Sequence, residues 1–491
     1  MKIPLINRLK WAENERMKEP WYKKYIRLLE GKLKHAEKEK EQAEDEAERL
    51  RKEKEGLEGE VKDLKRQLEE MAGAKASKRP RFPDYGLQKH ERALKKSVHK
   101  STGRIPFEEK LKQVQFTKDV YPAGIPPEKC ILRSQRIVTH MKDGQKEIWL
   151  YRMYREKWGK AHGRIPEVFG KSEYGVEIVT ALGFLVYVLQ LSQDQARQVL
   201  SFFTKVDLTK SEIESLLSGL GKEWKKEYDN LALLILFAEV LFIDETGWKI
   251  GKKNCYTWIF RSLTHTLLLY GEKRDEAVLD RILPRERFRG VGSSDCYKIY
   301  ENRFKAAQKC WAHFLRKAIK LMLLYPEKKH YHEFFKALYC IFTDAKALKL
   351  QDTEKTEGIG LLEERIKKLC SENERKLTKQ TLKDEREFVN LQKNLARNLK
   401  DLFTFVQVEA VEPTNNTAEQ GLRHVARSRN NYQTSKTKVG AERHSILASV
   451  FFSLKQNLKE FTLQSVTEEI IRWQRTGQSI FAEQLEILRS A

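Results

Sequence analysis

The sequence predicts an α/β protein in which a mixed sheet forms the central core and helical segments precede, interrupt and follow it. Three observations lead to this prediction. Short apolar runs separated by turns fill residues 239–297, as expected of a sheet. Helical spacing and helix start signals dominate residues 171–237 and 326–402. A heptad-like pattern runs through residues 31–71. At 491 residues, the chain is long enough for several domains.

The composition predicts a polyanionic partner. The formal net charge is +24 and the isoelectric point is near 9.5, so nucleic acid is the first candidate. An anionic membrane surface is the rival, but no stretch has 18 uninterrupted apolar residues, and no signal peptide is expected. The six cysteines are scattered without a CxxC pair, which argues against a zinc ribbon and fits a reducing compartment. We therefore expect a cytoplasmic, nucleoid-associated protein with no membrane partner.

Residues 1–73 are predicted to form an N-terminal helix and coiled coil. With Leu33 at heptad position a, the pattern continues for about six heptads to Met71. A coiled coil that pairs would make the protein a dimer, and a single solvated, charged helix is the alternative. Residues 74–112 are predicted to be a basic linker, which either lies along phosphates or merely solvates the chain. Its candidate DNA contacts are Lys78, Arg79 and Arg81.

A small β-rich domain is predicted over residues 113–170. The strand-like runs 131–141 and 148–154 flank Asp143-Gly144, a strong hairpin signal. This domain is a candidate for DNA contact or for plain packing.

Residues 171–237 are predicted to be helical. Ser192 suits the N-cap of one helix, and Thr209 or Ser211 suits the N-cap of the next, which should run to about Tyr228. Two short helices joined by a tight turn fit a helix-turn-helix that reads DNA, but any helical hairpin gives the same signal. Both interpretations stay open.

Residues 238–325 are predicted to form the first part of the core. Asp244 ends the first apolar run, a Gly/Lys-rich turn follows from Gly247 to Lys253, and Asp295 falls just past the fourth strand. One helix is expected over residues 304–324. Strand–strand–strand–helix–strand is the opening of a ribonuclease-H-like α/β core. The expected elements are strands at 239–243, 256–262, 265–270 and 290–293, with a helix near 275–282.

The remaining chain is predicted to interrupt and then complete this core. Residues 326–408 are highly charged and mostly helical, so they are expected to be an inserted helical subdomain. Residues 409–461 should complete the core, with Glu419 in a helix that begins near Asn416. Residues 462–491 should form a C-terminal helical tail.

Asp244, Asp295 and Glu419 are the candidate catalytic, metal-binding residues. The first and fourth strands of a ribonuclease-H-like sheet are neighbours, so the two aspartates should converge, and the late helix could bring Glu419 to them. Oxygen-only ligands suit two Mg²⁺ or Mn²⁺ ions and disfavour zinc. The bland alternative is that Asp244 only caps a turn. A basic segment around Glu419 suits contact with a DNA backbone, through Arg423, Arg427, Arg429, Lys436 and Lys438.

Several of these segments resemble a known family. The segments DETGW, SSDCYKIY, CWAHFLRKA, EPTNNTAEQGLR and GAERHSILASVFFSL resemble, in order, the catalytic blocks of bacterial DDE transposases of the insertion-sequence-sixty-six family. The resemblance spans about residues 174–461. It implies that Asp244, Asp295 and Glu419 form a metal-binding triad for cutting and joining DNA ends. The supporting active-site residues that it implies are His313, Asn415, Asn416 and Arg423.

The resemblance implies a DNA transposase that binds terminal inverted repeats and acts as a dimer or larger oligomer, with DNA and accessory proteins of the element as partners. The family carries a zinc-binding domain after its coiled coil, but here only Cys130 is available, so zinc is not expected. Gln420-Gly421 also departs from the family pattern. The alternatives are a transposase-derived DNA-binding or scaffold protein without cleavage, and a related nuclease that hydrolyses DNA without joining it. For His313, a satisfied core histidine remains the alternative.

Overall fold

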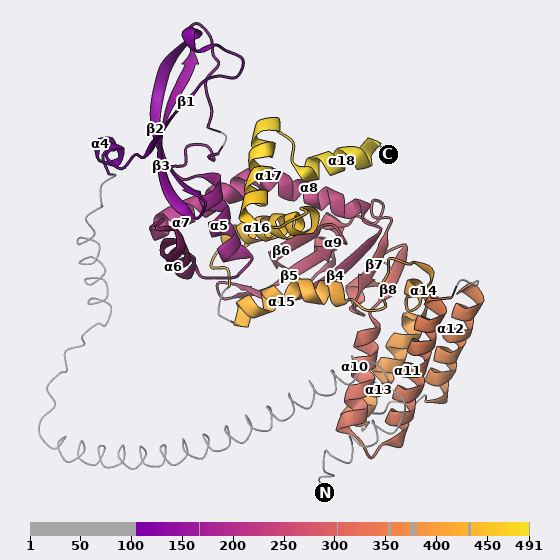
Figure 1. Cartoon of the computed structure of the whole chain (residues 1–491). Coiled ribbons are helices and arrows are strands. Elements are labelled where there is room, and N and C mark those ends of the chain that lie inside the picture. Colours follow the sequence, from indigo (N-terminus) through magenta and orange to yellow (C-terminus); the bar gives the residue numbers. More distant parts are fainter. Residues whose placement is uncertain are drawn as a thin grey trace, which may run out of the picture. The chain divides into compact units, whose positions relative to one another are not determined.

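The computed structural model describes residues 105–490, except Pro166, Asn302 and residues 352–354, 374–377, 379–380 and 431–433. The described chain is a mixed α/β structure with two sheets (Figure 1). The predicted coiled coil and Lys78, Arg79 and Arg81 lie outside the described residues. The end of the predicted linker contains a short helix, α4 (Phe107–Leu111). Within the described ranges, none of the helices has the length and apolar content needed to cross a membrane.

The first sheet is small and three-stranded, in the order β1-β3-β2. Strand β1 (Phe116–Val120) pairs parallel to β3 (Gln145–Glu156), and β2 (Cys130–Lys142) pairs antiparallel to β3. The β2–β3 turn is Asp143-Gly144, as the sequence predicts, and both residues have positive φ (50° and 74°). Two positive φ angles match the right-handed twist of the flanking strands.

Four helices connect the two sheets: α5 (Val176–Tyr187), α6 (Gln193–Thr204), α7 (Lys210–Glu223) and α8 (Lys225–Leu234). Ser192 and Thr209 each form a capping box with the residue three positions on, as the helix start signals predict. The prediction that the second helix runs to about Tyr228 is wrong. It ends at Glu223, because the chain turns at the buried Trp224, and α8 begins at Lys225.

The second sheet has five strands in the order β6-β5-β4-β7-β8. Neighbouring strands in the β6-β5-β4 half are antiparallel, whereas β4, β7 and β8 run parallel to one another. Helix α9 (Glu276–Ile282) connects β6 to β7. The first and fourth strands of this sheet in chain order, β4 and β7, are therefore neighbours, as predicted. The strands are β4 (Val240–Ile250), β5 (Lys253–Arg261), β6 (Thr266–Glu272), β7 (Val291–Ser294) and β8 (Ala306–Lys309).

Three predictions for this part of the core are wrong. Strand β4 does not end at Ile243 but continues to Ile250, because Trp248 is buried against Tyr270 and the backbone stays paired with β5. The predicted turn from Gly247 to Lys253 is consequently shorter and centres on Gly251, whose φ is +56°. The predicted helix over residues 304–324 is also shorter, since β8 occupies its first part and α10 (Trp311–Leu324) begins after it.

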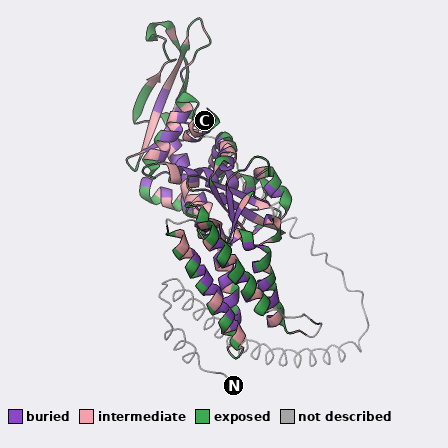
Figure 2. Cartoon of the chain, turned by 90° about the vertical axis from the view of Figure 1, so that its right-hand side faces the viewer, coloured by how far each residue is buried: buried purple, intermediate pink, exposed green. Residues whose placement is uncertain are grey.

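The predicted insertion is helical, and Figure 1 shows it beyond β8. Buried residues form stripes along these helices in Figure 2, and exposed residues cover their outer sides. Trp311 Nε1 donates to the carbonyl of Leu402 (2.7 Å), which ties α10 to the end of the insertion. The insertion contains α11 (Lys329–Lys349), α12 (Lys355–Glu372), α13 (Lys383–Arg397) and α14 (Thr404–Gln407).

Helix α16 (Lys438–Asn457) covers the outer edge of β6 with three serines spaced four residues apart. Their hydroxyls accept alternate backbone N–H groups of β6: Tyr270 to Ser445 (2.8 Å), Leu268 to Ser449 (2.8 Å) and Thr266 to Ser453 (3.0 Å). Four residues of helix rise about 6.0 Å and two residues of strand about 6.7 Å, so the two repeats nearly match.

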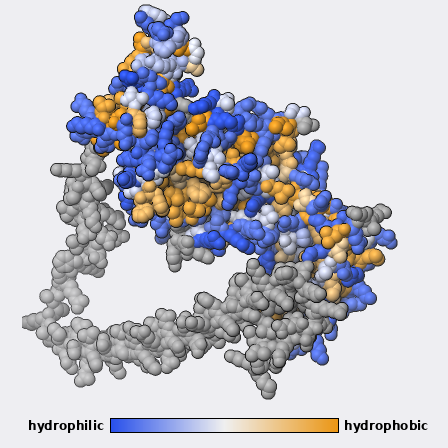
Figure 3. Space-filling view, viewed as in Figure 1, coloured by the Kyte–Doolittle hydropathy of each residue, from blue (hydrophilic) through white to orange (hydrophobic). Residues whose placement is uncertain are grey.

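At the opposite edge, β8 is covered as well. The Thr404 hydroxyl donates to the carbonyl of Ala307 (2.6 Å), and Gln308 Oε1 accepts from the N–H of Phe405 (2.8 Å). Three further helices complete the chain: α15 (Asn416–Asn430), α17 (Leu463–Thr476) and α18 (Ile480–Ser490). On the face of the molecule seen in Figure 3, hydrophilic side chains cover much of the surface, and hydrophobic patches lie between them.

Candidate active site

Asp244 on β4 and Asp295 directly after β7 lie at the same level of two neighbouring strands. In the parallel β4–β7 pairing, Phe242 stands beside Ser293, and each aspartate follows two residues later along the chain. Two residues are one full repeat of a strand, and neighbouring strands lie about 4.8 Å apart. The register therefore brings these two aspartates to one side of the sheet. Asp244 lies within β4 rather than at its tip, because β4 continues past it.

The orientations of both aspartates are fixed by local backbone groups. Asp244 Oδ1 accepts the N–H of Glu245 (2.9 Å), and Asp295 Oδ1 accepts the N–H of Tyr297 (2.8 Å). Each carboxylate thus uses one oxygen to hold its own position. The second oxygen of each has no hydrogen-bond partner among the described residues.

Glu419 reaches the same region from α15, which packs on β4 and β5 (Figure 1). Asn415 precedes this helix and is fully buried. Its Nδ2 donates to the carbonyl of Ile243 (2.7 Å), immediately before Asp244. Gly421 allows α15 to approach β5 closely, since a Cβ at this position would lie 2.3 Å from Ile259 Cδ1. The Gln420-Gly421 departure noted in the sequence therefore has a packing explanation.

The electrostatics show that the three predicted carboxylates interact. Burial, together with the negative charges of Glu245, Asp295 and Glu419, raises the pKa of Asp244 to about 7. Glu419 is balanced by Arg316, whose guanidinium lies 2.6 Å from Oε1. The site is a partly buried cluster of negative charge with one cation at its border.

Glu245, the next residue in β4, has a different role from Asp244. Its side chain is only 1% exposed and is held by Arg274 (2.5 Å) and by the Tyr300 hydroxyl (2.5 Å). Arg274 in turn lies over the Tyr297 ring, 3.8 Å from its centre. These contacts join β4 to the segment that follows Asp295, so Glu245 is a structural residue beside the candidate site.

The closest group of metal-ligand atoms in the described residues was not predicted from the sequence. One ligand atom each of Cys310, His313 and Glu419 lie within 4.8 Å of one another, whereas Asp244 and Asp295 are outside this group. His313 Nδ1 is buried without a hydrogen-bond partner among the described atoms. Burial and Arg316 lower the pKa of His313, while Asp295 and Glu419 oppose that shift. A signal existed in CWAHFLRKA, where Cys310 and His313 stand three residues apart at the start of α10.

Sequence reasoning also missed Lys309, the last residue of β8. Its side chain is fully buried, and its Nζ donates to Ser294 Oγ (3.2 Å) and to the carbonyl of Tyr300 (3.3 Å). Burial lowers the pKa of Lys309, and Cys296, Asp401 and Asp295 oppose that shift. This lysine supports the segment that carries Asp295. Asn416, predicted as a supporting residue, is exposed at the first position of α15.

The predicted basic residues after Glu419 occupy two kinds of position. Arg429 hydrogen-bonds to Thr246 Oγ1 (3.3 Å) and to the carbonyl of Gly247 (3.1 Å), so it ties α15 to β4. The segment before α16 runs beside the β4–β5 hairpin, because Gly251 N donates to the carbonyl of Ser435 (2.9 Å). The remaining four are exposed: Arg423, Arg427, Lys436 and Lys438.

A comparison with protein families identifies a match for this chain. The model of the transposase IS66 family matches residues 171–443, which include Asp244, Asp295 and Glu419. A search of curated proteins finds no match for the chain.

Proposed function

Because the chain belongs to the transposase IS66 family, we propose that it cuts the ends of a DNA element at its terminal inverted repeats and joins them to target DNA. The single observation that carries the proposal is the common level of Asp244, on β4, and Asp295, directly after β7, with Glu419 on α15 close enough to raise the pKa of Asp244. The strand order β6-β5-β4-β7-β8, with only β4, β7 and β8 parallel, supports a ribonuclease-H-like core.

The donor set fits divalent metal ions. Three carboxylates repel one another in a partly buried place, and Asp244 and Asp295 each leave one oxygen unpartnered among the described residues. Hard cations such as Mg²⁺ and Mn²⁺ prefer oxygen ligands of this kind. Asp244, Asp295 and Glu419 would hold them. Bound metal ions in such a site activate the attacking oxygen and stabilise the leaving oxygen of a phosphodiester.

The protein's own groups would position the reacting DNA. Backbone N–H groups fix the two aspartates, and Asn415 fixes the start of α15 against β4. Arg316 holds the Glu419 carboxylate by an ion pair of 2.6 Å and would place positive charge near a phosphate bound at this site. The exposed Arg423, Arg427, Lys436 and Lys438 would neutralise DNA phosphates beside the site.

The experiment is metal-dependent cleavage and strand transfer with duplexes that carry the inverted repeats flanking the gene. Asp244→Asn and Glu419→Gln should abolish both reactions and leave DNA binding intact. Glu442→Gln changes an exposed carboxylate on α16 and is the matched control, with wild-type activity expected. Full activity of either site variant would refute the proposed triad. Binding of the ends without nicking at any metal concentration would favour the scaffold alternative, and cleavage without joining would favour a nuclease.

A further inference from the structure

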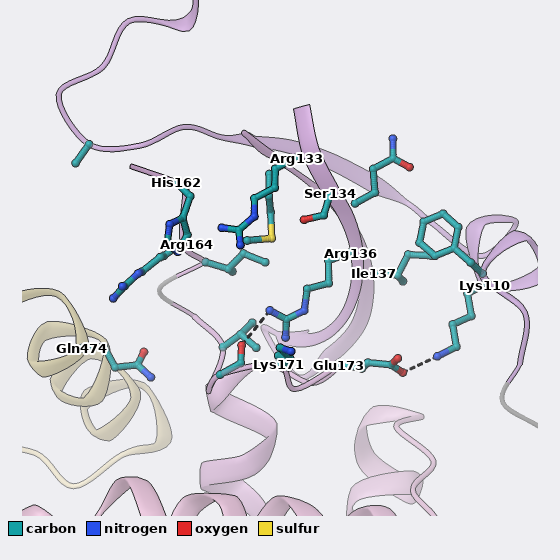
Figure 4. A pocket seen from close by; sticks show the side chains of 18 of the residues that line it. Lys110, Arg133, Ser134, Arg136, Ile137, His162, Arg164, Lys171, Glu173 and Gln474 are labelled. Atoms are coloured by element: carbon teal, nitrogen blue, oxygen red, sulfur yellow. Dashed lines mark hydrogen bonds and ion pairs between the residues drawn. The ribbon is translucent and has the colours of Figure 1, made fainter. Parts of the chain in front are cut away.

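A large groove lies on the small sheet, away from the carboxylate site. It has a volume of about 1230 Å³ and is bordered by β2, by the chain between β3 and α5, by α4 and by the end of α17 (Figure 4). Its floor contains the buried side chains of Ile137, Ile165 and Val168, which give it a firm base.

The border of this groove is strongly positive. Lys110 forms an ion pair (2.5 Å) with Glu173, which is the one carboxylate among the described residues that line the groove. Arg136 donates to the carbonyls of Gly170 and Ser172, so its guanidinium is held in place at the border, near the negative charge of Glu173. The four other cations at the border are exposed and form no ion pair with a described carboxylate: Arg133, Arg164, Lys171 and Arg475.

A β-bulge in β2 brings two of these arginines to the same groove. In a regular strand, residues three apart point to opposite faces. The pairing of β2 with β3 shifts register between Leu132 and Ser134, so Arg133 is an extra residue without a partner on β3. An extra residue inverts the alternation, and Arg133 and Arg136 therefore both line the groove.

This chemistry suits a phosphodiester backbone. Guanidinium groups bind phosphate oxygens through paired hydrogen bonds, and a row of uncompensated cations releases counterions from DNA. An anionic membrane is disfavoured because the apolar residues of the groove lie at its buried floor rather than on a protruding surface.

We propose that this groove is a second DNA site, which grips the backbone of duplex DNA without regard to sequence while the carboxylate site acts elsewhere on the DNA. The proposal rests on the proposed function for the identity of the nucleic acid. The groove is formed by residues 105–173 and the end of α17, so it is separate from the basic surface beside Glu419.

The test measures binding of the full-length protein to a fluorescent duplex of random sequence across a KCl series, with EDTA present so that cleavage plays no part. The double variant Arg133→Ala/Arg164→Ala removes two groove cations. Each lost phosphate contact should lower the slope of log affinity against log salt by about 0.9, so the slope should fall by about 1.8, with at least about tenfold weaker binding at low salt. Arg155→Ala is the matched control, since Arg155 is an exposed arginine on β3 that does not line the groove.

An unchanged slope in the folded double variant would overturn the proposal, and so would an equal effect of Arg155→Ala. Circular dichroism and thermal unfolding establish that the variants are folded. Vesicles with an anionic phospholipid and inorganic phosphate are tested in parallel. If the groove cations are needed for binding vesicles and the protein prefers vesicles to the duplex, the groove is a lipid site. If low concentrations of inorganic phosphate displace the duplex, the groove is a site for free phosphate. Either result would reject the DNA site. Because EDTA excludes catalysis, failure of this binding test leaves the cleavage proposal intact. Failure of the cleavage experiment likewise leaves this binding result intact.

Discussion

Replacing Gly421 with alanine should displace Glu419 and slow DNA cleavage by on the order of a hundredfold. A Cβ at position 421 would lie 2.3 Å from Ile259 Cδ1. Carbon atoms in contact lie about 3.5–4.0 Å apart, so one side must move by about 1.2–1.7 Å. The clashing Cδ1 is the end of a side chain, but Ile259 is fully buried and has little free space to rotate into, so α15 is expected to move instead. A shift of about 1 Å in a catalytic group costs on the order of a hundredfold in rate.

The same substitution should affect stability only modestly. Overpacking costs about 1–3 kcal/mol, whereas alanine in a helix gains about 1 kcal/mol over glycine. The net loss is up to about 2 kcal/mol, so the variant should fold while it cleaves slowly. This separation distinguishes a displaced active site from general unfolding.

The assay is single-turnover cleavage of an end duplex at saturating protein, together with urea unfolding. Gly360→Ala is the control, because Gly360 is also helical and a Cβ there would meet nothing within 4 Å. Ile259→Val removes the one atom that clashes, at a cost of about 0.5–1.5 kcal/mol, and should restore cleavage in the double variant. Wild-type cleavage by Gly421→Ala, or no recovery with Ile259→Val, would refute the reasoning.

Three further predictions follow from other parts of the structure. Glu245→Gln should lower the free energy of unfolding by about 2 kcal/mol, measured in urea, because it breaks a buried pair with a partly exposed arginine; an unchanged midpoint would contradict the structural role. Cd²⁺ should inhibit Mg²⁺-supported cleavage by binding Cys310, His313 and Glu419, and a sulfur–cadmium absorption band should appear in the ultraviolet. Cys310→Ser should remove both the inhibition and the band, and equal inhibition of this variant would exclude the site. Burial lowers the pKa of His424 to about 4 and of His444 to about 3, so below their unfolded pKa of about 6.5 the unfolded chain binds protons that the folded chain rejects. The contribution of these histidines to stability should thus be complete above about pH 6.5 and fall below that pH by up to about 1.4 kcal/mol per pH unit for each histidine. His444→Gln should reduce this dependence, and an unchanged pH profile of thermal unfolding in this variant would contradict the prediction.

Local sequence signals predicted the elements whose structure depends on neighbours in the chain. The Asp143-Gly144 turn needs only two residues that tolerate positive φ. The N-caps at Ser192 and Thr209 need only a side chain three residues away. These features appear in the structure where the sequence places them.

The errors arise where tertiary contacts decide the structure. Strand β8 has only four residues, without apolar alternation, and its polar side chains are buried because distant groups accept their hydrogen bonds. The polar half of β4 remains a strand because it pairs with β5 along its whole length. The approach of Cys310 to Glu419 joins residues more than a hundred positions apart, and no local pattern specifies that distance.

The serines of α16 have a consequence for how copies of this protein can meet. A strand at the edge of a sheet normally offers free N–H and C=O groups that recruit a strand from another chain, and this is a common route to aggregation. Here the serines of α16 accept the edge N–H groups of β6 in place of another strand. At the other edge, β8 is covered by the contacts of Thr404 and Gln308. At the β6 edge, a second copy could extend the sheet only by displacing α16, with its buried Leu447, Val450 and Phe451. The five-stranded sheet is therefore protected against strand exchange, and assembly of several copies on DNA would have to use other surfaces.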